Sequence, residues 1–82
     1  MRLPRDLSGE RLAASLRRFG YEVTRQTGSH LRLTTTIQGR EHHVTIPRHG
    51  ALRVGTLAAI LADVADHLGV ERDELLERLL RR

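Results

Sequence analysis

The chain has 82 residues, enough for one small domain that buries roughly 60 to 65% of the surface of its unfolded chain. It contains neither cysteine nor lysine, which excludes thiol nucleophiles, cysteine zinc sites, phosphate-loop lysines and Schiff bases. All 14 basic residues are arginines, and with 10 acidic residues the formal net charge is +4. A codon bias toward arginine would explain the missing lysine. The positive excess favours a polyanionic partner, either nucleic acid or an acidic protein surface.

The chain carries no signal for a membrane or for export. No apolar run approaches the length of a membrane span, and the first five residues lack the apolar centre of a signal peptide. The absence of cysteine fits a reducing compartment. We therefore expect a soluble cytoplasmic protein with no membrane contact.

The first predicted element is an amphipathic helix over residues 9–19. Ser8 is a good N-cap, and Gly20 ends the helix as the residue after the cap. Apolar residues recur at spacings of four and three and form one stripe, while arginines occupy the opposite side. The stripe consists of Leu12, Leu16 and Phe19.

Three strands follow and form an antiparallel meander. Residues 21–26 alternate with β-branched and aromatic side chains, and Thr27 and Gly28 make a tight connection to a second strand that begins at His30. A turn at Gln38 and Gly39 leads to a third strand over residues 41–46.

The period of two assigns the side chains of these strands to two faces. The face predicted to be core holds Tyr21, Val23, Leu31, Leu33, Val44 and Ile46. The face predicted to be open holds Thr24, His30, Arg32, His43 and Thr45. An imidazole on an open face beside an arginine is well placed for acid–base chemistry on a large anionic substrate.

Two helices complete the chain. Pro47 ends the third strand, residues 48–53 form a loop, and a helix with apolar residues at spacings of three and four opens at residues 55–57 and ends at Gly69. A last helix begins at about Glu71. Its expected packing face is Leu75, Leu76, Leu79 and Leu80. The order α-β-β-β-α-α predicts one α+β domain over residues 1–82, with helices on one face of the sheet.

With these residues in view, the chain resembles the HicA family of toxin–antitoxin ribonucleases. The matching features span nearly the whole chain: Ser8 before a helix that ends in Phe19-Gly20-Tyr21, the turn Gly28-Ser29-His30, the run Val44-Thr45-Ile46-Pro47-Arg48-His49, and Gly55-Thr56-Leu57 with Ile60-Leu61. The resemblance implies a fold like the double-stranded RNA-binding domain (dsRBD-like), here with an additional C-terminal helix. The chain departs from the family where residues 62–68 lengthen the second helix.

The resemblance also implies a function. The chain is expected to be the toxin of a type II toxin–antitoxin system, an endoribonuclease that cleaves messenger RNA and arrests growth. Its partners are expected to be RNA and a HicB-like antitoxin, through which alone it would form an oligomer. In the family the histidine of the glycine-serine-histidine turn is catalytic, which corresponds here to His30. The expected RNA contacts are Arg32, Arg48, Ser29 and His49.

The chemistry of the residues agrees with that expectation. RNA carries its own nucleophile, the 2′-hydroxyl, so one imidazole with neighbouring arginines can cleave RNA without a metal or another cofactor. Aromatic residues make up only 2% of the chain, and both are assigned to the core, so base stacking platforms are missing and sequence preference should be loose.

The remaining histidines have other expected roles. A zinc site at His42, His43 and His49 is disfavoured, because adjacent strand residues point to opposite faces. His42 is expected at the edge of the core and His43 in solvent, while His49 either fixes its loop or supports the site. His67, near a helix end, is expected only to favour the helix dipole.

Two other functions remain open from the residues. A non-catalytic RNA-binding module of the same fold would bind RNA without cleaving it. A DNA-binding regulator that reads the major groove with its second helix is disfavoured, because that helix has no arginine between Val54 and Gly69.

Overall fold

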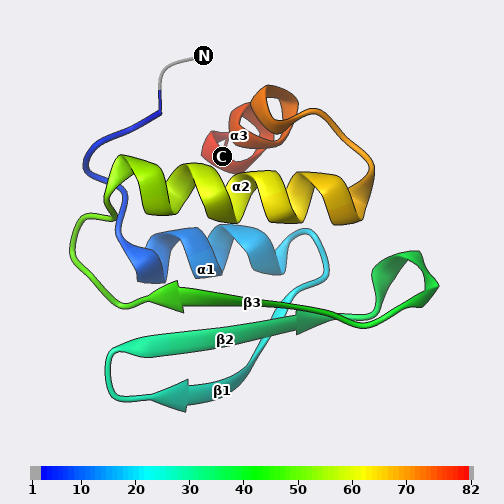
Figure 1. Cartoon of the computed structure of the whole chain (residues 1–82), viewed down its shortest axis with the longest axis horizontal. Helices are drawn as coiled ribbons and strands as arrows, with labels where there is room; N and C mark the ends of the chain where they lie inside the picture. Colours follow the sequence, from blue (N-terminus) through cyan, green and yellow to red (C-terminus); the bar gives the residue numbers. More distant parts are fainter. Residues whose placement is uncertain (1–2, 82) are drawn as a thin grey trace.

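The computed structural model describes residues 3–81 and has the predicted order of elements (Figure 1). These are α1 (Gly9–Arg17), β1 (Glu22–Thr27), β2 (His30–Thr35), the 3-10 turn η1 (Ile37–Gly39), β3 (His42–Pro47), α2 (Val54–Leu68) and α3 (Arg72–Leu80). The α+β class and the three-stranded antiparallel sheet are confirmed.

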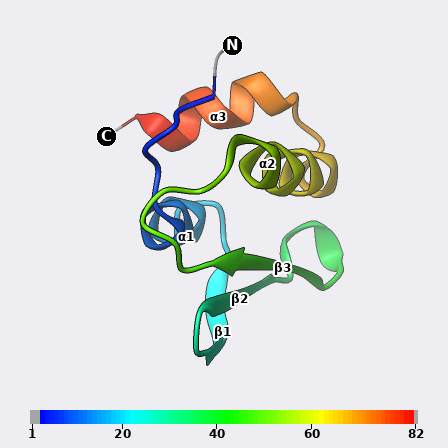
Figure 2. The same cartoon turned by 60° about the vertical axis from the view of Figure 1, so that its left-hand side comes forward.

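The sheet has the order β1-β2-β3 and is covered on one face only. Helices α1 and α2 pack on that face, and α3 packs on α1 and α2 on the side away from the sheet (Figure 2). Within residues 3–81 no helix packs on the opposite face of the sheet. None of the described helices combines the length and the apolarity needed to cross a membrane.

The core lies between the sheet and the two inner helices. On the sheet, five of the six residues predicted to face inward are buried: Tyr21, Leu31, Leu33, Val44 and Ile46. Leu33 is fully buried in the central strand and pairs with Val23 on one side and Val44 on the other. The alternation of apolar residues therefore identified the covered face correctly.

Val23 is the exception, since its side chain is 43% exposed. β1 is the edge strand, and all six of its residues are exposed. A β-bulge between Val23 and Arg25 adds one residue to β1, so that Arg25 pairs with Arg32 and Gln26 with Leu31. One extra residue moves every later side chain to the opposite face. Arg25 consequently joins the open face, where the period of two had not placed it.

The ends of α1 follow their predicted chemistry, although the helix is shorter than expected. Ser8 caps the helix, because its Oγ accepts a hydrogen bond of 3.1 Å from the backbone N–H of Arg11. The helix ends at Arg17 rather than at residue 19, and Phe19 is only partly buried. Gly20 has a φ of +93°, and the side chain of Ile37 occupies the space that a Cβ there would need. Glycine alone fits this turn.

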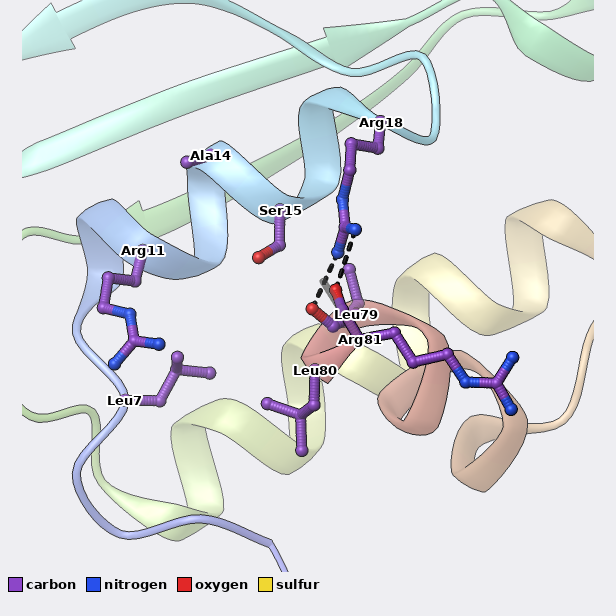
Figure 3. Close-up of a pocket in the computed structure, with 8 residues that line it drawn as sticks. All are labelled: Leu7, Arg11, Ala14, Ser15, Arg18, Leu79, Leu80 and Arg81. Atoms are coloured by element: carbon purple, nitrogen blue, oxygen red, sulfur yellow. Dashed lines mark hydrogen bonds between the residues drawn. The ribbon is translucent and has the colours of Figure 1, made fainter.

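Besides its packing on the core, the C-terminal helix α3 is hydrogen-bonded to an arginine at the end of α1. Arg18 Nη1 donates a hydrogen bond of 2.9 Å to the carbonyl of Arg81, and its Nη2 donates a bond of 2.8 Å to the carbonyl of Leu79 (Figure 3). The same Nη2 donates a bond of 3.3 Å to the carbonyl of Arg78. A cation at these carbonyls satisfies groups that have no partner within the helix. Leu80, expected on the packing face, is instead 48% exposed.

We expect Arg18→Ala to loosen α3 selectively. The variant removes a charged donor from three carbonyls. We expect the free energy of local unfolding of α3 to fall by about 1 to 2 kcal/mol, a modest amount because the guanidinium group is exposed to solvent. Hydrogen exchange of the α3 amides measures the effect. The neighbouring Arg17→Ala is the matched control, and equal exchange in the two variants would contradict the anchoring role of Arg18.

Polar side chains from β3, α2 and the residue before β1 interact at the edge of the core, and the position of one of them differs from its prediction. His67 is buried, its Nε2 donates a 2.9 Å hydrogen bond to the carbonyl of Ile37, and its ring stacks on His42 with centroids 4.4 Å apart. The expectation that His67 only favours the helix dipole is therefore wrong. His42 lies at the edge of the core as predicted, between the Tyr21 hydroxyl at 2.8 Å from Nδ1 and Asp63 Oδ1 at 3.0 Å from Nε2.

Burial of Tyr21, together with the charge of Asp63, raises the pKa of this phenol from 10.0 to about 12. The unfolded chain then loses the phenolic proton at a lower pH than the folded chain does. Stability should be complete below pH 10 and should fall as the pH rises toward 12, by about 1.4 kcal/mol per pH unit. The chain has no lysine or cysteine, and Tyr21 is its only tyrosine, so no other side chain is expected to titrate in this window.

Urea denaturation at several pH values between 9 and 12 measures this dependence. Tyr21→Phe removes the ionisable group and should flatten the curve in that window. A parental protein whose stability is constant from pH 10 to 12 would contradict the burial of the Tyr21 hydroxyl.

Candidate functional site

Three segments meet at the end of the sheet where β2 begins. The β1–β2 turn contacts the loop after β3, since the backbone N–H of Arg48 donates a 2.6 Å hydrogen bond to the carbonyl of Ser29. The same loop contacts the start of α1, where the N–H of Gly9 donates a 3.0 Å bond to the carbonyl of His49. This end of the molecule thus gathers Ser29, Arg48 and His49, which the sequence had grouped with His30.

Gly9 explains how closely the loop approaches α1. A Cβ at this position would collide with the carbonyl oxygen of Pro47. Any larger residue would push the loop away from the helix, and with it the backbone bond between Arg48 and Ser29. The first residue of α1 therefore sets the position of the loop beside the turn.

His30 is the first residue of β2, and it is exposed on the open face of the sheet. It lines a shallow hollow of about 210 Å³ together with side chains from all three strands. The lining residues are Arg25, Thr27, His30, Arg32 and Thr45. The predicted outward direction of His30 and Arg32 is confirmed.

The imidazole of His30 has one nitrogen beside a hydroxyl and one open. Ser29 Oγ lies 3.3 Å from Nδ1, and among residues 3–81 no group is hydrogen-bonded to Nε2. Nδ1 can thus remain hydrogen-bonded to Ser29 while Nε2 interacts with a ligand in the hollow.

The hollow is positively charged. Arg25 and Arg32 are paired residues on neighbouring strands, and no carboxylate is among the described residues that line the hollow. Two guanidinium groups beside an imidazole suit a phosphodiester. The sequence analysis missed Arg25, because the bulge that turns it outward leaves no mark in the alternation of residue types.

Arg48 lies at the rim, where its side chain already has partners. Its Nη2 and Nε donate bonds of 2.9 and 3.2 Å to Glu10 Oε1, and its Nη1 lies 3.5 Å from the carbonyl of Gly28. These contacts tie the β1–β2 turn to α1. The His49 side chain is exposed on the same loop.

The other histidines of the described chain face elsewhere. His43 Nδ1 lies 2.8 Å from Thr34 Oγ1 and its Nε2 lies 2.7 Å from Glu41 Oε1, at the far end of β3 from the hollow. His42 is turned to the opposite face and stacked on His67. No group of three or more histidine, cysteine, aspartate or glutamate side chains within residues 3–81 is arranged to hold a metal ion.

Comparison with known proteins gives one family match. The family model described as the HicA toxin of bacterial toxin–antitoxin systems matches residues 9–65, which extend from the first residue of α1 into α2. The match includes the β1–β2 turn, the hollow and the loop after β3, and it ends before α3. No significant match was found among curated proteins or among solved structures.

Proposed function

The chain belongs to the HicA toxin family, and from this premise we propose that it is a metal-independent endoribonuclease that cleaves messenger RNA and uses His30 as its acid–base group. The observation that supports the proposal best is the hollow on the open sheet face. It combines an exposed imidazole, whose Nε2 has no hydrogen-bond partner among residues 3–81, with two arginines, and it lies on the face of the sheet that no described helix covers.

The proposed reaction needs two proton transfers. The 2′-oxygen of the substrate loses its proton and attacks the adjacent phosphorus, and the bond from phosphorus to the 5′-oxygen breaks as that oxygen gains a proton. The products are a 2′,3′-cyclic phosphate and a 5′-hydroxyl end. His30 Nε2 performs one of these transfers, a role that contributes on the order of 10² to 10⁴-fold to a rate.

The arginines and Ser29 have supporting roles in this proposal. Arg32 and Arg25 stabilise the extra negative charge on the phosphorane, because both residues line the hollow together with His30. Ser29 orients the imidazole through Nδ1. Arg48 holds the β1–β2 turn in place through Glu10, and direct contacts of Arg48 and His49 with RNA phosphates stay predictions.

The substrate is proposed to be single-stranded messenger RNA cut with loose sequence preference. The hollow contains no aromatic side chain, and Tyr21 is buried. Bases therefore have no stacking platform there, and most of the affinity would come from phosphate contacts. A HicB-like antitoxin is proposed to control the toxin by covering this basic face with an acidic surface.

The mechanism is tested with two substrates of identical sequence, one RNA and one containing 2′-deoxynucleotides. We expect cleavage of the RNA in the presence of a chelator, with cyclic phosphate ends, and no cleavage of the deoxy strand. Binding of RNA without cleavage under all conditions would favour the alternative, a non-catalytic RNA-binding module. Cleavage of the deoxy strand would contradict the use of the 2′-hydroxyl.

A further inference from the structure

A second surface feature lies at the other end of the sheet from His30. It is a groove of about 530 Å³ between the C-terminal end of α1, the η1 turn, and the connection from α2 to α3. The groove is lined by Arg17, Arg18, Phe19, Gly20, Ile37, Leu68, Val70 and Arg78. It is more than twice the size of the hollow around His30, which is about 210 Å³.

The floor of the groove is apolar and accessible. Ile37 is 43% exposed, and Phe19, Leu68 and Val70 pack on the core but are only partly buried. Ile37 is held against Gly20, whose missing side chain makes room for it. Apolar side chains that gather at one exposed place mark a binding surface more often than scattered ones do.

The rim of the groove carries positive charge. Arg17, Arg18 and Arg78 line it, and no aspartate or glutamate does so among the described residues. Arg17 and Arg78 are exposed, and Arg78 lies 3.7 Å from Glu74 on the same helix, a weak surface pair. An apolar floor inside a guanidinium rim complements a segment with apolar side chains flanked by carboxylates.

The groove depends on the part of the chain beyond the family match. Leu68, Val70 and Arg78 follow residue 65, where the match ends. Helix α3 is fixed there by the hydrogen bonds of Arg18 to its last carbonyls (Figure 3). The additional helix therefore contributes Arg78 to the groove, and it is hydrogen-bonded to Arg18 at the end of α1.

We propose that this groove is a second docking site for the antitoxin and that it receives a short acidic segment with an apolar anchor residue. The proposal rests on the proposed function, since it takes the antitoxin as the partner. The groove and His30 lie at opposite ends of β2, which runs from His30 to Thr35. One antitoxin can hold the groove while another part of it covers the site, and the residues after 65 then select the cognate antitoxin.

An RNA ligand fits the groove less well than a peptide. The floor is mainly aliphatic, with one partly buried aromatic ring, so it offers little for base stacking. Burial of a leucine or isoleucine side chain of a partner on Ile37 and Val70 uses the apolar floor, and carboxylates on either side use the arginines.

The test measures the affinity of purified toxin variants for the HicB-like antitoxin, which the family resemblance implies is encoded beside the toxin. We expect the double variant Arg17→Glu/Arg78→Glu to bind the antitoxin about tenfold or more weaker than the parent, and its affinity to depend less on salt concentration. We expect Ile37→Asp to weaken binding as well. The control is Arg5→Glu/Arg72→Glu, which changes the net charge by the same amount at two residues that do not line the groove. Circular dichroism confirms that each variant is folded.

Growth arrest without the antitoxin provides the second measurement. The groove variants should arrest growth as the parent does, because the groove is remote from His30. The proposal would be overturned if the folded Arg17→Glu/Arg78→Glu variant bound the antitoxin with parental affinity. It would also be overturned if that variant lost RNA affinity while its antitoxin binding was unchanged, or if the parent did not bind the antitoxin. If the groove variants bind the antitoxin more weakly but the parent never cleaves RNA, the groove is supported as a docking site and the proposed nuclease activity is contradicted.

Discussion

Leu33→Asp is expected to be unfolded at room temperature. Leu33 is fully buried in the central strand between the sheet and the helices, with Val23 and Val44 as its paired neighbours. A carboxylate there has no cationic partner, and burial without a partner costs several kcal/mol, out of a total stability of about 5 to 15 kcal/mol.

Far-ultraviolet circular dichroism and thermal melting measure the effect of this substitution. Leu80→Asp is the matched control, because Leu80 is 48% exposed and the same change there should cost less than about 1 kcal/mol. A Leu33→Asp protein that melts like the parent would show that the faces of the sheet are assigned wrongly.

The sequence predicted the covered face of the sheet because each strand follows the pleat with alternating residue types. Leu31, Leu33 and Ile46 show this, and the ends of the helices were marked by Ser8 and by Gly69, whose φ is +71°. These are local effects, which a short stretch of sequence contains.

The errors arose where distant segments decide the outcome. Val23 has the right residue type for a core position, but its edge strand leaves it exposed. His67 is buried because the carbonyl of Ile37, thirty residues earlier, accepts its hydrogen bond. Leu80 belongs to an apolar run, yet the way α3 lies on α1 turns it outward. Tertiary packing overrides the local pattern in each case.

The His30→Ala variant is expected to remain folded and to lose its toxicity. His30 is exposed, so its removal from the open face should change the free energy of unfolding by no more than about 0.5 to 1 kcal/mol. Loss of the proton transfer should reduce RNA cleavage by about 10² or more and abolish growth arrest. RNA affinity should change little, because the arginines supply it.

His43→Ala is the matched control for this substitution. It removes an imidazole from the same face of the sheet, at the end away from the hollow, where Thr34 and Glu41 hold the ring. We expect this variant to arrest growth and cleave RNA as the parent does. Equal losses in both variants would show that the open face acts through its overall charge and that His30 has no special role.

Only part of the candidate site could be predicted from the sequence. His30 and Arg32 were placed by counting residues along one strand, and the structure confirms their direction. Arg25 was missed because a bulge is not visible in residue types. The salt bridge of Arg48 with Glu10 joins residues 38 positions apart, and no local pattern reveals such a pair.

The most direct test of the account is the rate of RNA cleavage by folded His30→Ala under single-turnover conditions, measured beside the parent and His43→Ala. We predict a rate about 10² or more below that of the parent for His30→Ala and a parental rate for His43→Ala. A folded His30→Ala protein that cleaves RNA at the parental rate would contradict the assignment of His30 as the catalytic group.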